Sequence, residues 1–227
     1  MKFKLSPSSI SLMEECPRCF WLEKHDVWSR PAGIFPSLPS GMDRILKRHF
    51  DIFRDKNLLP PELCRQQSCE NLKLFGSNEK EKELLEVWRN NKKGVSFADE
   101  QGNVLRGAVD NILVKGRKLI VLDYKTRGFP LKEDTSGHYR NQLDIYNFLL
   151  SRNGYDIEDY SFLLFYFPKE IQDTGEVIFD TELVKMPVSI ENAEKLWKKA
   201  LKLLNSDCPE ETCEWCRCIS QQQSKHL

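Results

Sequence analysis

The sequence contains no hydrophobic run that approaches the roughly 18 residues needed to cross a membrane. Its opening residues, MKFKLSPSS, lead into no apolar segment of the kind that directs secretion. We therefore expect a cytoplasmic protein without a membrane partner. Net charge is also absent, because 34 basic and 34 acidic residues balance. This balance argues against a protein that coats nucleic acid non-specifically, but it allows an enzyme with a local basic groove.

Internal repeats, low-complexity tracts and a phosphate-binding loop of the G-x-x-x-x-G-K-[ST] type are missing as well. Without that loop the chain has no nucleotide-driven motor of its own. Its 227 residues, of which 40% are hydrophobic and 30% charged, are typical of a globular protein of one domain. We expect residues 1–227 to form that single domain.

Cysteine, in contrast, is plentiful, and its spacing indicates a metal centre. The chain has eight cysteines, and disulfides are not expected in a protein of the reducing cytosol. Two C-x-x-C pairs lie near opposite ends of the chain: Cys16 with Cys19, and Cys213 with Cys216. Thiolates in this arrangement suit tetrahedral Zn²⁺ or an iron–sulfur cluster, and spacing does not decide between them. Unligated buried thiols are the alternative, and Cys64 and Cys69 are expected to be structural or incidental.

The hydrophobic pattern changes from helical to strand-like near residue 94. Helices are expected from Ser6 and Pro7 through Leu22 and over residues 42–56, 78–90, 137–152 and 189–205. Strands are expected over residues 94–98, 104–114, 118–126, 160–167 and 176–186. This order predicts an α/β fold in which a central mixed sheet is flanked by helices.

Two neighbouring predicted strands, LRGAVDNILV and KLIVLDYKT, end in charged side chains. Strand alternation places Asp123 and Lys125 on one face of the second strand, and Asp110 follows an apolar stretch in the first. Two converging carboxylates form an oxygen site suited to Mg²⁺ or Mn²⁺, and a nearby lysine can stabilise the negative charge of a phosphodiester transition state. The alternative is a salt bridge between Asp123 and Lys125, with Asp110 in a turn.

The next predicted helix carries Gln142 and Tyr146, which lie four residues apart and therefore on one face. The set GAVD, DYK and QLDIY resembles the RecB-like branch of the PD-(D/E)xK nuclease superfamily. The segments LSPSSISLMEECPRCFWL and CEWC are similar to those of CRISPR-associated RecB-like exonucleases. The resemblance implies a restriction-endonuclease-like core at about 94–170, a helical part at 1–93 and a cysteine-rich tail at 206–227.

The resemblance also implies roles for individual residues. Asp110 and Asp123 would bind Mg²⁺ or Mn²⁺, and Lys125 would be the catalytic lysine. Gln142 and Tyr146 would support the site and contact DNA.

Two further metal ligands are implied by the resemblance. The backbone carbonyl of Tyr124 would complete the metal shell, and His49 on an early helix would be a third ligand. His49 also shares its predicted helix face with Ile45, Ile52 and Phe53, which suits a core histidine.

The same resemblance implies a [4Fe–4S] cluster, with structural Zn²⁺ as the alternative, that joins the two ends of the chain through Cys16, Cys19, Cys213 and Cys216. The expected activity is that of a DNA exonuclease on single-stranded ends, with a helicase or another DNA-processing protein as partner. Two rival hypotheses remain: a catalytically silent nucleic-acid-binding or adaptor protein, and a metal-stapled structural protein.

Overall fold

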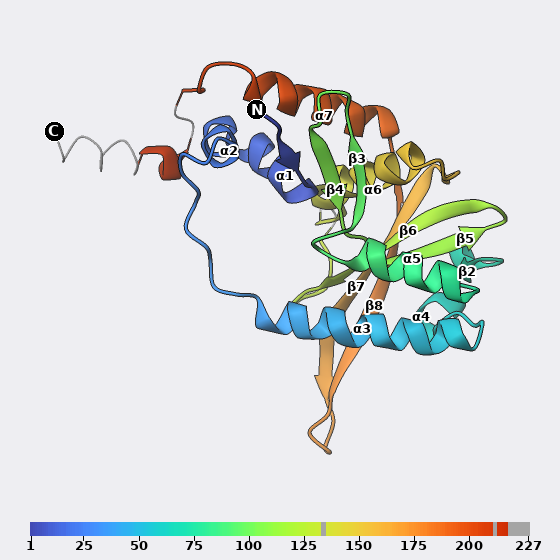
Figure 1. Cartoon of the computed structure of the whole chain (residues 1–227). Coiled ribbons are helices and arrows are strands. Elements are labelled where there is room, and N and C mark those ends of the chain that lie inside the picture. Colours follow the sequence, from blue (N-terminus) through green and yellow to red (C-terminus); the bar gives the residue numbers. More distant parts are fainter. Residues whose placement is uncertain (133–134, 211–212, 218–227) are drawn as a thin grey trace.

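The computed structural model describes residues 1–132, 135–210 and 213–217 (Figure 1). Its helices are α1 (Pro7–Glu15), α2 (Pro17–Lys24), α3 (Ser37–Asp55), α4 (Pro61–Cys64), α5 (Glu79–Arg89), α6 (Arg140–Arg152) and α7 (Ile190–Leu204). Its strands are β1 (Lys4–Leu5), β2 (Lys73–Leu74), β3 (Val95–Ala98), β4 (Val104–Gly107), β5 (Asn111–Lys115), β6 (Lys118–Thr126), β7 (Tyr160–Ile171) and β8 (Val177–Pro187). Short 3₁₀ turns occur at Gln67–Cys69 and Thr135–Tyr139.

The strands form two sheets. The larger sheet has the order β2-β5-β6-β7-β8, in which β6 and β7 run parallel and the other neighbours run antiparallel. The smaller sheet has the order β1-β4-β3. The α/β fold with a mixed sheet flanked by helices is therefore confirmed.

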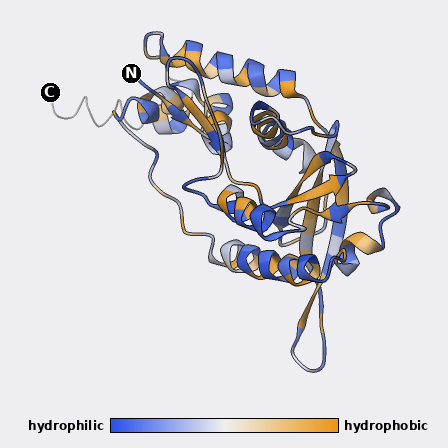
Figure 2. Cartoon of the chain, turned by 45° about the vertical axis from the view of Figure 1, so that its right-hand side comes forward, coloured by the Kyte–Doolittle hydropathy of each residue, from blue (hydrophilic) through white to orange (hydrophobic). Residues whose placement is uncertain are grey.

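Strand β6 lies at the centre of the larger sheet and has apolar side chains on both faces. Leu119 and Val121 point into the core that also contains Leu143 of α6. Ile120 and Leu122 point into a second core on the opposite face, against α3. In Figure 2 the strands of the larger sheet are coloured largely hydrophobic, whereas the helices carry hydrophobic and hydrophilic residues in turn. The two-residue alternation thus predicts the faces of β6 correctly.

The first predicted helix is divided in two. Pro17 lacks the backbone N–H that would continue the hydrogen-bond ladder, and the residue before a proline is disfavoured in helical geometry. Cys16 accordingly has an extended backbone, with φ −153° and ψ 103°, and it caps both the end of α1 and the start of α2. The break turns the side chains of Cys16 and Cys19 toward each other.

The strand predicted over residues 104–114 is also divided, because the chain passes from one sheet to the other. It leaves β4 after Gly107 and enters β5 at Asn111. The crossing is held by α5: Val109 N–H donates to Trp88 O over 3.1 Å, and Arg89 Nε donates to Asp110 O over 2.9 Å. Asp110 therefore lies in the connection between two strands, not within one.

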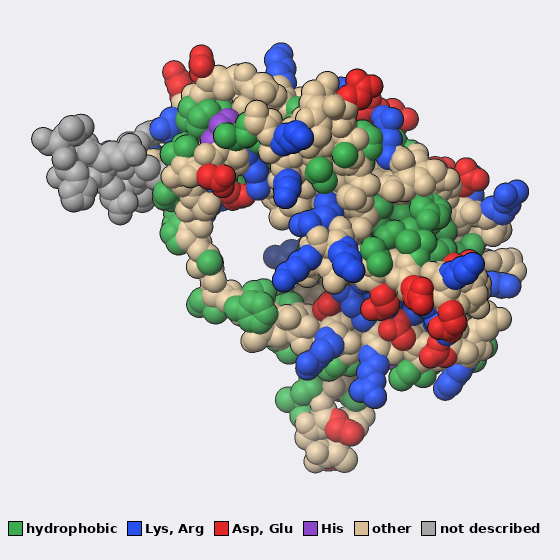
Figure 3. All heavy atoms as spheres, viewed as in Figure 1, with side chains coloured by type: hydrophobic (Ala, Val, Ile, Leu, Met, Phe, Trp, Pro, Cys, Tyr) green, Lys and Arg blue, Asp and Glu red, His purple; other side chains and the backbone are tan. Residues whose placement is uncertain are grey.

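Helix α3 begins five residues earlier than the range 42–56 predicted for it. The segment over residues 25–36, which is exposed from residue 31 onward, leads to it from α2. Figure 3 shows an opening between this segment, α1 and α3, with Lys and Arg side chains at its edge. Among the described residues, no helix combines the length and apolar character needed to span a membrane.

Candidate active site and cysteine centre

The carboxylate of Asp123 and the ammonium of Lys125 meet on one face at the end of β6. Asp123 Oδ2 and Lys125 Nζ form an ion pair, in which the Asp123 side chain is 2% exposed and that of Lys125 is 17% exposed. The Lys125 ammonium also lies 4.6 Å from the centroid of the Tyr139 ring. A buried carboxylate is costly unless it is paired, and this ammonium is its charged partner.

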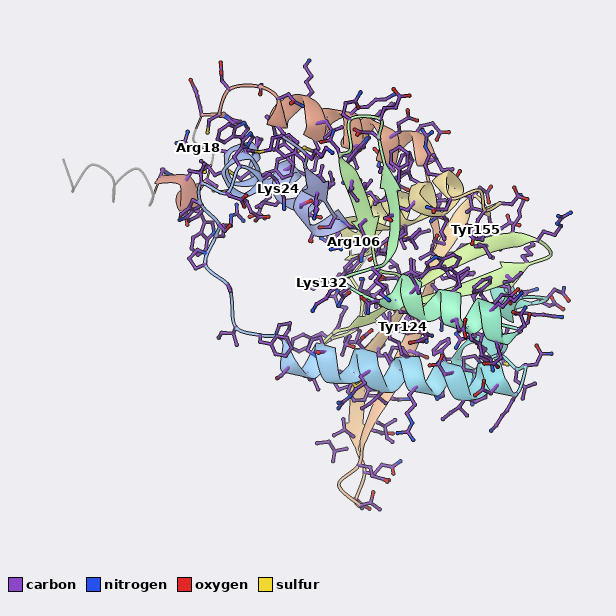
Figure 4. The ribbon with its side chains drawn as sticks, in the orientation of Figure 1. Arg18, Lys24, Arg106, Tyr124, Lys132 and Tyr155 are labelled. Atoms are coloured by element: carbon purple, nitrogen blue, oxygen red, sulfur yellow. The ribbon has the colours of Figure 1, made fainter. Side chains whose placement is uncertain are left out.

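Asp110 reaches the same place from the β4–β5 connection. Its Oδ2 accepts a hydrogen bond from the backbone N–H of Tyr124 over 2.9 Å, and its carboxyl lies within hydrogen-bonding reach of the Asp123 carboxyl. The structure therefore brings Asp110, Asp123 and Lys125 together, as the sequence predicts. Tyr124 itself lies between α3 and the sheet (Figure 4), where its hydroxyl accepts from Asn111 Nδ2 over 2.6 Å.

The pKa values of both carboxyl groups are displaced upward. Burial, followed by the nearby Asp110 charge, raises the pKa of Asp123 to about 7, and Lys125 opposes this shift. Burial also raises the pKa of Asp110, while the charge of Lys47 opposes the increase. Two carboxyl groups this close in a poorly solvated place do not ionise together without added positive charge.

Helix α6 supplies the amide that connects these groups. Gln142 Oε1 accepts from Lys125 Nζ over 3.0 Å, while Gln142 Nε2 donates to Tyr146 Oη over 2.7 Å and to Asp123 Oδ1 over 3.4 Å. The Tyr146 ring packs on Gly107, where an added Cβ would lie 2.6 Å from a ring carbon. The pair Gln142 and Tyr146 is thus in the site, as the four-residue spacing indicates.

The oxygen donors of the site fit a divalent cation. Asp123 Oδ2 is buried and receives no hydrogen bond from an uncharged donor in the described part of the chain. It faces a charged group instead, the Lys125 ammonium. Carboxylate oxygens that converge without enough donors are suitable ligands for Mg²⁺ or Mn²⁺. Asp110 and Asp123 therefore fit such an ion.

His49 does not join this group. Its Nε2 lies 3.0 Å from Glu62 Oε1, and that same oxygen accepts from Tyr166 Oη over 2.6 Å. The His49 ring packs edge-on against Phe53. His49 is thus held on another side of α3, beside Glu62.

Helix α3 instead turns two other residues toward Asp110, and the sequence analysis did not identify either as part of the site. Lys47 Nζ lies 3.4 Å from Asp110 Oδ1 and 2.9 Å from Asp43 Oδ1. The four-residue spacing of Asp43 and Lys47 is a signal of one shared helix face. Nothing in the sequence indicates that this face would dock on Asp110.

Four cysteines form a compact cluster that joins the two ends of the chain. Sulfur–sulfur distances are 3.3 Å for Cys16 and Cys216, 3.4 Å for Cys19 and Cys216, and 3.5 Å for Cys19 and Cys213. All four sulfurs lie within 4.8 Å of one another. The two predicted C-x-x-C pairs therefore meet and could hold a metal.

The thiol spacing bears on the kind of metal. A single tetrahedral Zn²⁺ with bonds of about 2.3 Å sets its sulfurs about 3.8 Å apart. An iron–sulfur cluster places inorganic sulfide and several irons between its thiolates, so the same four cysteines would have to separate further. Binding of Zn²⁺ would therefore require a smaller movement of the four cysteine side chains than binding of an iron–sulfur cluster.

The other cysteines in the described part of the chain are not members of this cluster. Cys64 and Cys208 are exposed. Cys69 is 2% exposed and belongs to the core beneath α3, which is a structural position. Cys218 lies outside the described residues.

Residues 4–221 match the family model described as the PD-(D/E)XK nuclease superfamily. The chain belongs to the PD-(D/E)XK nuclease superfamily. The match spans both halves of the candidate active site and all four clustered cysteines. Proteins of this superfamily are generally nucleases that use divalent metal ions, so the family assignment indicates nucleic-acid hydrolysis. A search of curated proteins found no match to the chain.

Proposed function

We propose that this PD-(D/E)XK protein is a Mg²⁺- or Mn²⁺-dependent deoxyribonuclease of the RecB-like branch that degrades DNA from single-stranded ends. The observation that carries the proposal is the convergence of Asp110 and Asp123 beside the Lys125 ammonium. A catalytically silent adaptor has no use for two close carboxylates, one of them buried, whose mutual repulsion costs stability.

Each residue has a distinct role in this proposal. Asp110 and Asp123 hold the divalent ion, with the Tyr124 carbonyl as a further oxygen donor. Such an ion would polarise the scissile phosphate and lower the pKa of an attacking water. Lys125 orients that water and stabilises the negative charge that develops on the phosphate oxygens. Gln142 holds the Lys125 ammonium through its Oε1, and Tyr146 in turn fixes Gln142.

The preference for single-stranded ends rests on the resemblance to RecB-like exonucleases and on the surroundings of the site. The opening between α1 and α3 has basic side chains at its edge (Figure 3). Unwinding of a duplex would come from a helicase or another DNA-processing partner.

The cysteine centre is proposed to be structural. It joins α1 and α2 to the region after α7 and shares no residue with the carboxylate site. The resemblance favours a [4Fe–4S] cluster and the sulfur spacing favours Zn²⁺. Iron and zinc analysis of anaerobically purified protein separates them.

The deciding experiment follows end-labelled single-stranded and double-stranded DNA over time with Mn²⁺, with Mg²⁺ and with a chelator. We expect metal-dependent shortening of the single strand from its end. A folded protein that binds DNA but leaves it intact under all metal conditions would establish the adaptor hypothesis instead. A matched RNA substrate tests the preference for DNA.

A further inference from the structure

A cavity of about 380 Å³ lies between α3 and α5, next to the carboxylate site. The residues that line it are Arg44, Lys47, Arg48, Asp51, Glu86, Arg89 and Asn90. Four of these side chains are cationic and two are anionic. None of the lining residues was assigned a role in the proposed chemistry.

The two anionic side chains are already neutralised by arginine. Asp51 Oδ1 lies 2.8 Å from Arg89 Nη1 and also forms an ion pair with Arg54. Glu86 Oε1 lies 3.0 Å from the same Arg89 nitrogen. Arg44 and Arg48 are exposed and form no ion pair within the described residues. The cavity therefore retains positive charge for an anion from outside.

Arg89 gives the cavity a rigid, buried donor. Its side chain is 5% exposed, and its Nε donates to Asp110 O over 2.9 Å. Its Nη2 is buried and has no hydrogen-bond partner among the residues that the structure describes. A buried arginine nitrogen without a partner is energetically costly, so its presence here suits a ligand that supplies acceptor oxygens.

Lys47 links the cavity to the chemistry. It lines the cavity, and its Nζ lies 3.4 Å from Asp110 Oδ1. A strand whose scissile phosphate lies at Asp110 and Asp123 carries another phosphate one nucleotide away on each side. Arginine binds phosphate with two parallel hydrogen bonds, and two arginines are available here.

We propose that this cavity is a subsite for a backbone phosphate of the substrate strand, adjacent to the phosphate that is cleaved. The proposal rests on the proposed nuclease function for its assignment of the scissile phosphate. Arg44 and Arg48 attract the phosphate, Lys47 reaches it from the side of the carboxylates, and Arg89 fixes the cavity wall. The subsite sets the direction in which the strand crosses the site.

The test replaces the two exposed arginines together, as Arg44→Gln/Arg48→Gln. The control is Arg65→Gln/Arg117→Gln, which removes the same charge from two exposed arginines outside the cavity lining. Binding of a fluorescein-labelled single-stranded oligonucleotide is measured by anisotropy in chelator, so that no catalysis is needed. We expect the cavity variant to raise Kd about 10-fold and the control to stay within about 2-fold of the parent.

Salt dependence gives a second readout. Each phosphate contact on a single strand contributes about 0.7 to the slope of log affinity against log salt. The cavity variant should lose about 0.7 or more of that slope, and the control should keep the parent slope. In cleavage assays the cavity variant should raise KM and leave kcat within about 2-fold. Equal Kd and equal slope for the two double variants would overturn the subsite.

Substrates with one uncharged backbone linkage show which phosphate the cavity contacts. Oligonucleotides with a single methylphosphonate are prepared on each side of the phosphate that the parent cleaves. For one of the two modified oligonucleotides, kcat/KM of the parent should be about 10-fold lower than for the unmodified oligonucleotide. For Arg44→Gln/Arg48→Gln the same modification should lower kcat/KM much less. A penalty of equal size in both proteins would refute the subsite. A parent that binds as expected but never cleaves DNA or RNA would refute the nuclease function and leave the anion-binding cavity in place.

Discussion

The amide oxygen of Gln142 accepts a hydrogen bond from the Lys125 ammonium over 3.0 Å, so helix α6 holds the lysine at the end of β6. The same amide donates to Asp123 and to Tyr146 through its nitrogen. One side chain thereby fixes the relative positions of the proposed metal ligand and the proposed catalytic lysine. The arrangement makes the site dependent on the packing of α6 against the sheet.

Cleavage should fall by about 100-fold or more in each of three variants, Asp110→Asn, Asp123→Asn and Lys125→Ala. Each variant removes a metal ligand or a charge that stabilises the transition state. The fold should persist, as judged by circular dichroism. Cleavage is measured on end-labelled DNA at saturating Mn²⁺. Parent-like turnover by folded Asp123→Asn would show that the chemistry occurs elsewhere.

Gln142→Leu should lower kcat about 10-fold with little change in KM, because Lys125 loses the acceptor that orients its ammonium. Tyr146→Phe removes the hydroxyl that holds the Gln142 amide nitrogen but leaves the Gln142 oxygen to accept from Lys125, so it should have the smaller effect. Steady-state kinetics on one oligonucleotide gives kcat and KM for both variants. If Tyr146→Phe were the more damaging of the two, Tyr146 would contact the substrate directly.

His49→Ala should destabilise the protein by about 1 kcal/mol, because it removes a partly exposed hydrogen bond to Glu62 and the packing against Phe53. The Mg²⁺ concentration for half-maximal activity should not change. Thermal unfolding and a Mg²⁺ titration are run on the same preparation. A shifted titration with unchanged stability would restore His49 as a metal ligand.

The stability of the metal-free protein should fall as pH rises toward 7. The pKa of Asp123 is raised from 3.8 to about 7, so between these values the folded state binds more protons than the unfolded state. The free energy of unfolding therefore decreases as pH increases, on the order of 2 kcal/mol between about pH 5 and 7. Denaturant unfolding in chelator at several pH values measures the slope of the unfolding free energy against pH. Asp123→Asn should show a smaller slope. Equal slopes would mean that Asp123 is already ionised at low pH in the folded state.

Cys16→Ser should give poorly soluble protein that has lost its metal. Cys16 and Cys216 are 200 residues apart, so a shared metal closes most of the chain into one loop. Cys64→Ser is the matched control and should be nearly silent, because Cys64 is exposed. Cys69→Ser, however, buries a hydroxyl in the core and should cost about 1–3 kcal/mol.

Metal analysis of the parent completes that experiment. A brown protein that absorbs near ~400 nm would contain iron–sulfur, and a colourless protein with bound zinc would contain the single ion. Folded protein with neither metal and four freely alkylated thiols would refute the metal centre.

The sequence by itself determined the features that depend on local periodicity. A two-residue alternation identifies the shared face of Asp123 and Lys125, and a four-residue spacing identifies that of Gln142 and Tyr146. The C-x-x-C spacing likewise indicates two pairs of metal ligands, and only the tertiary structure brings the two pairs together. These predictions succeed because backbone geometry alone directs side chains within one strand or one helix.

Only the tertiary structure decided which distant segments meet. Asp110 lies in a crossing between two sheets, held by α5, and the alternating pattern of its neighbours cannot reveal that crossing. Helix α3 docks with Asp43 and Lys47 toward Asp110 and with His49 toward Glu62. The rotation of an amphipathic helix about its axis is set by the cores it buries, here through Leu46 and Phe50 against the larger sheet. That packing depends on residues far away in the chain, which is why the sequence identified the helix but not the side chains it brings to the site.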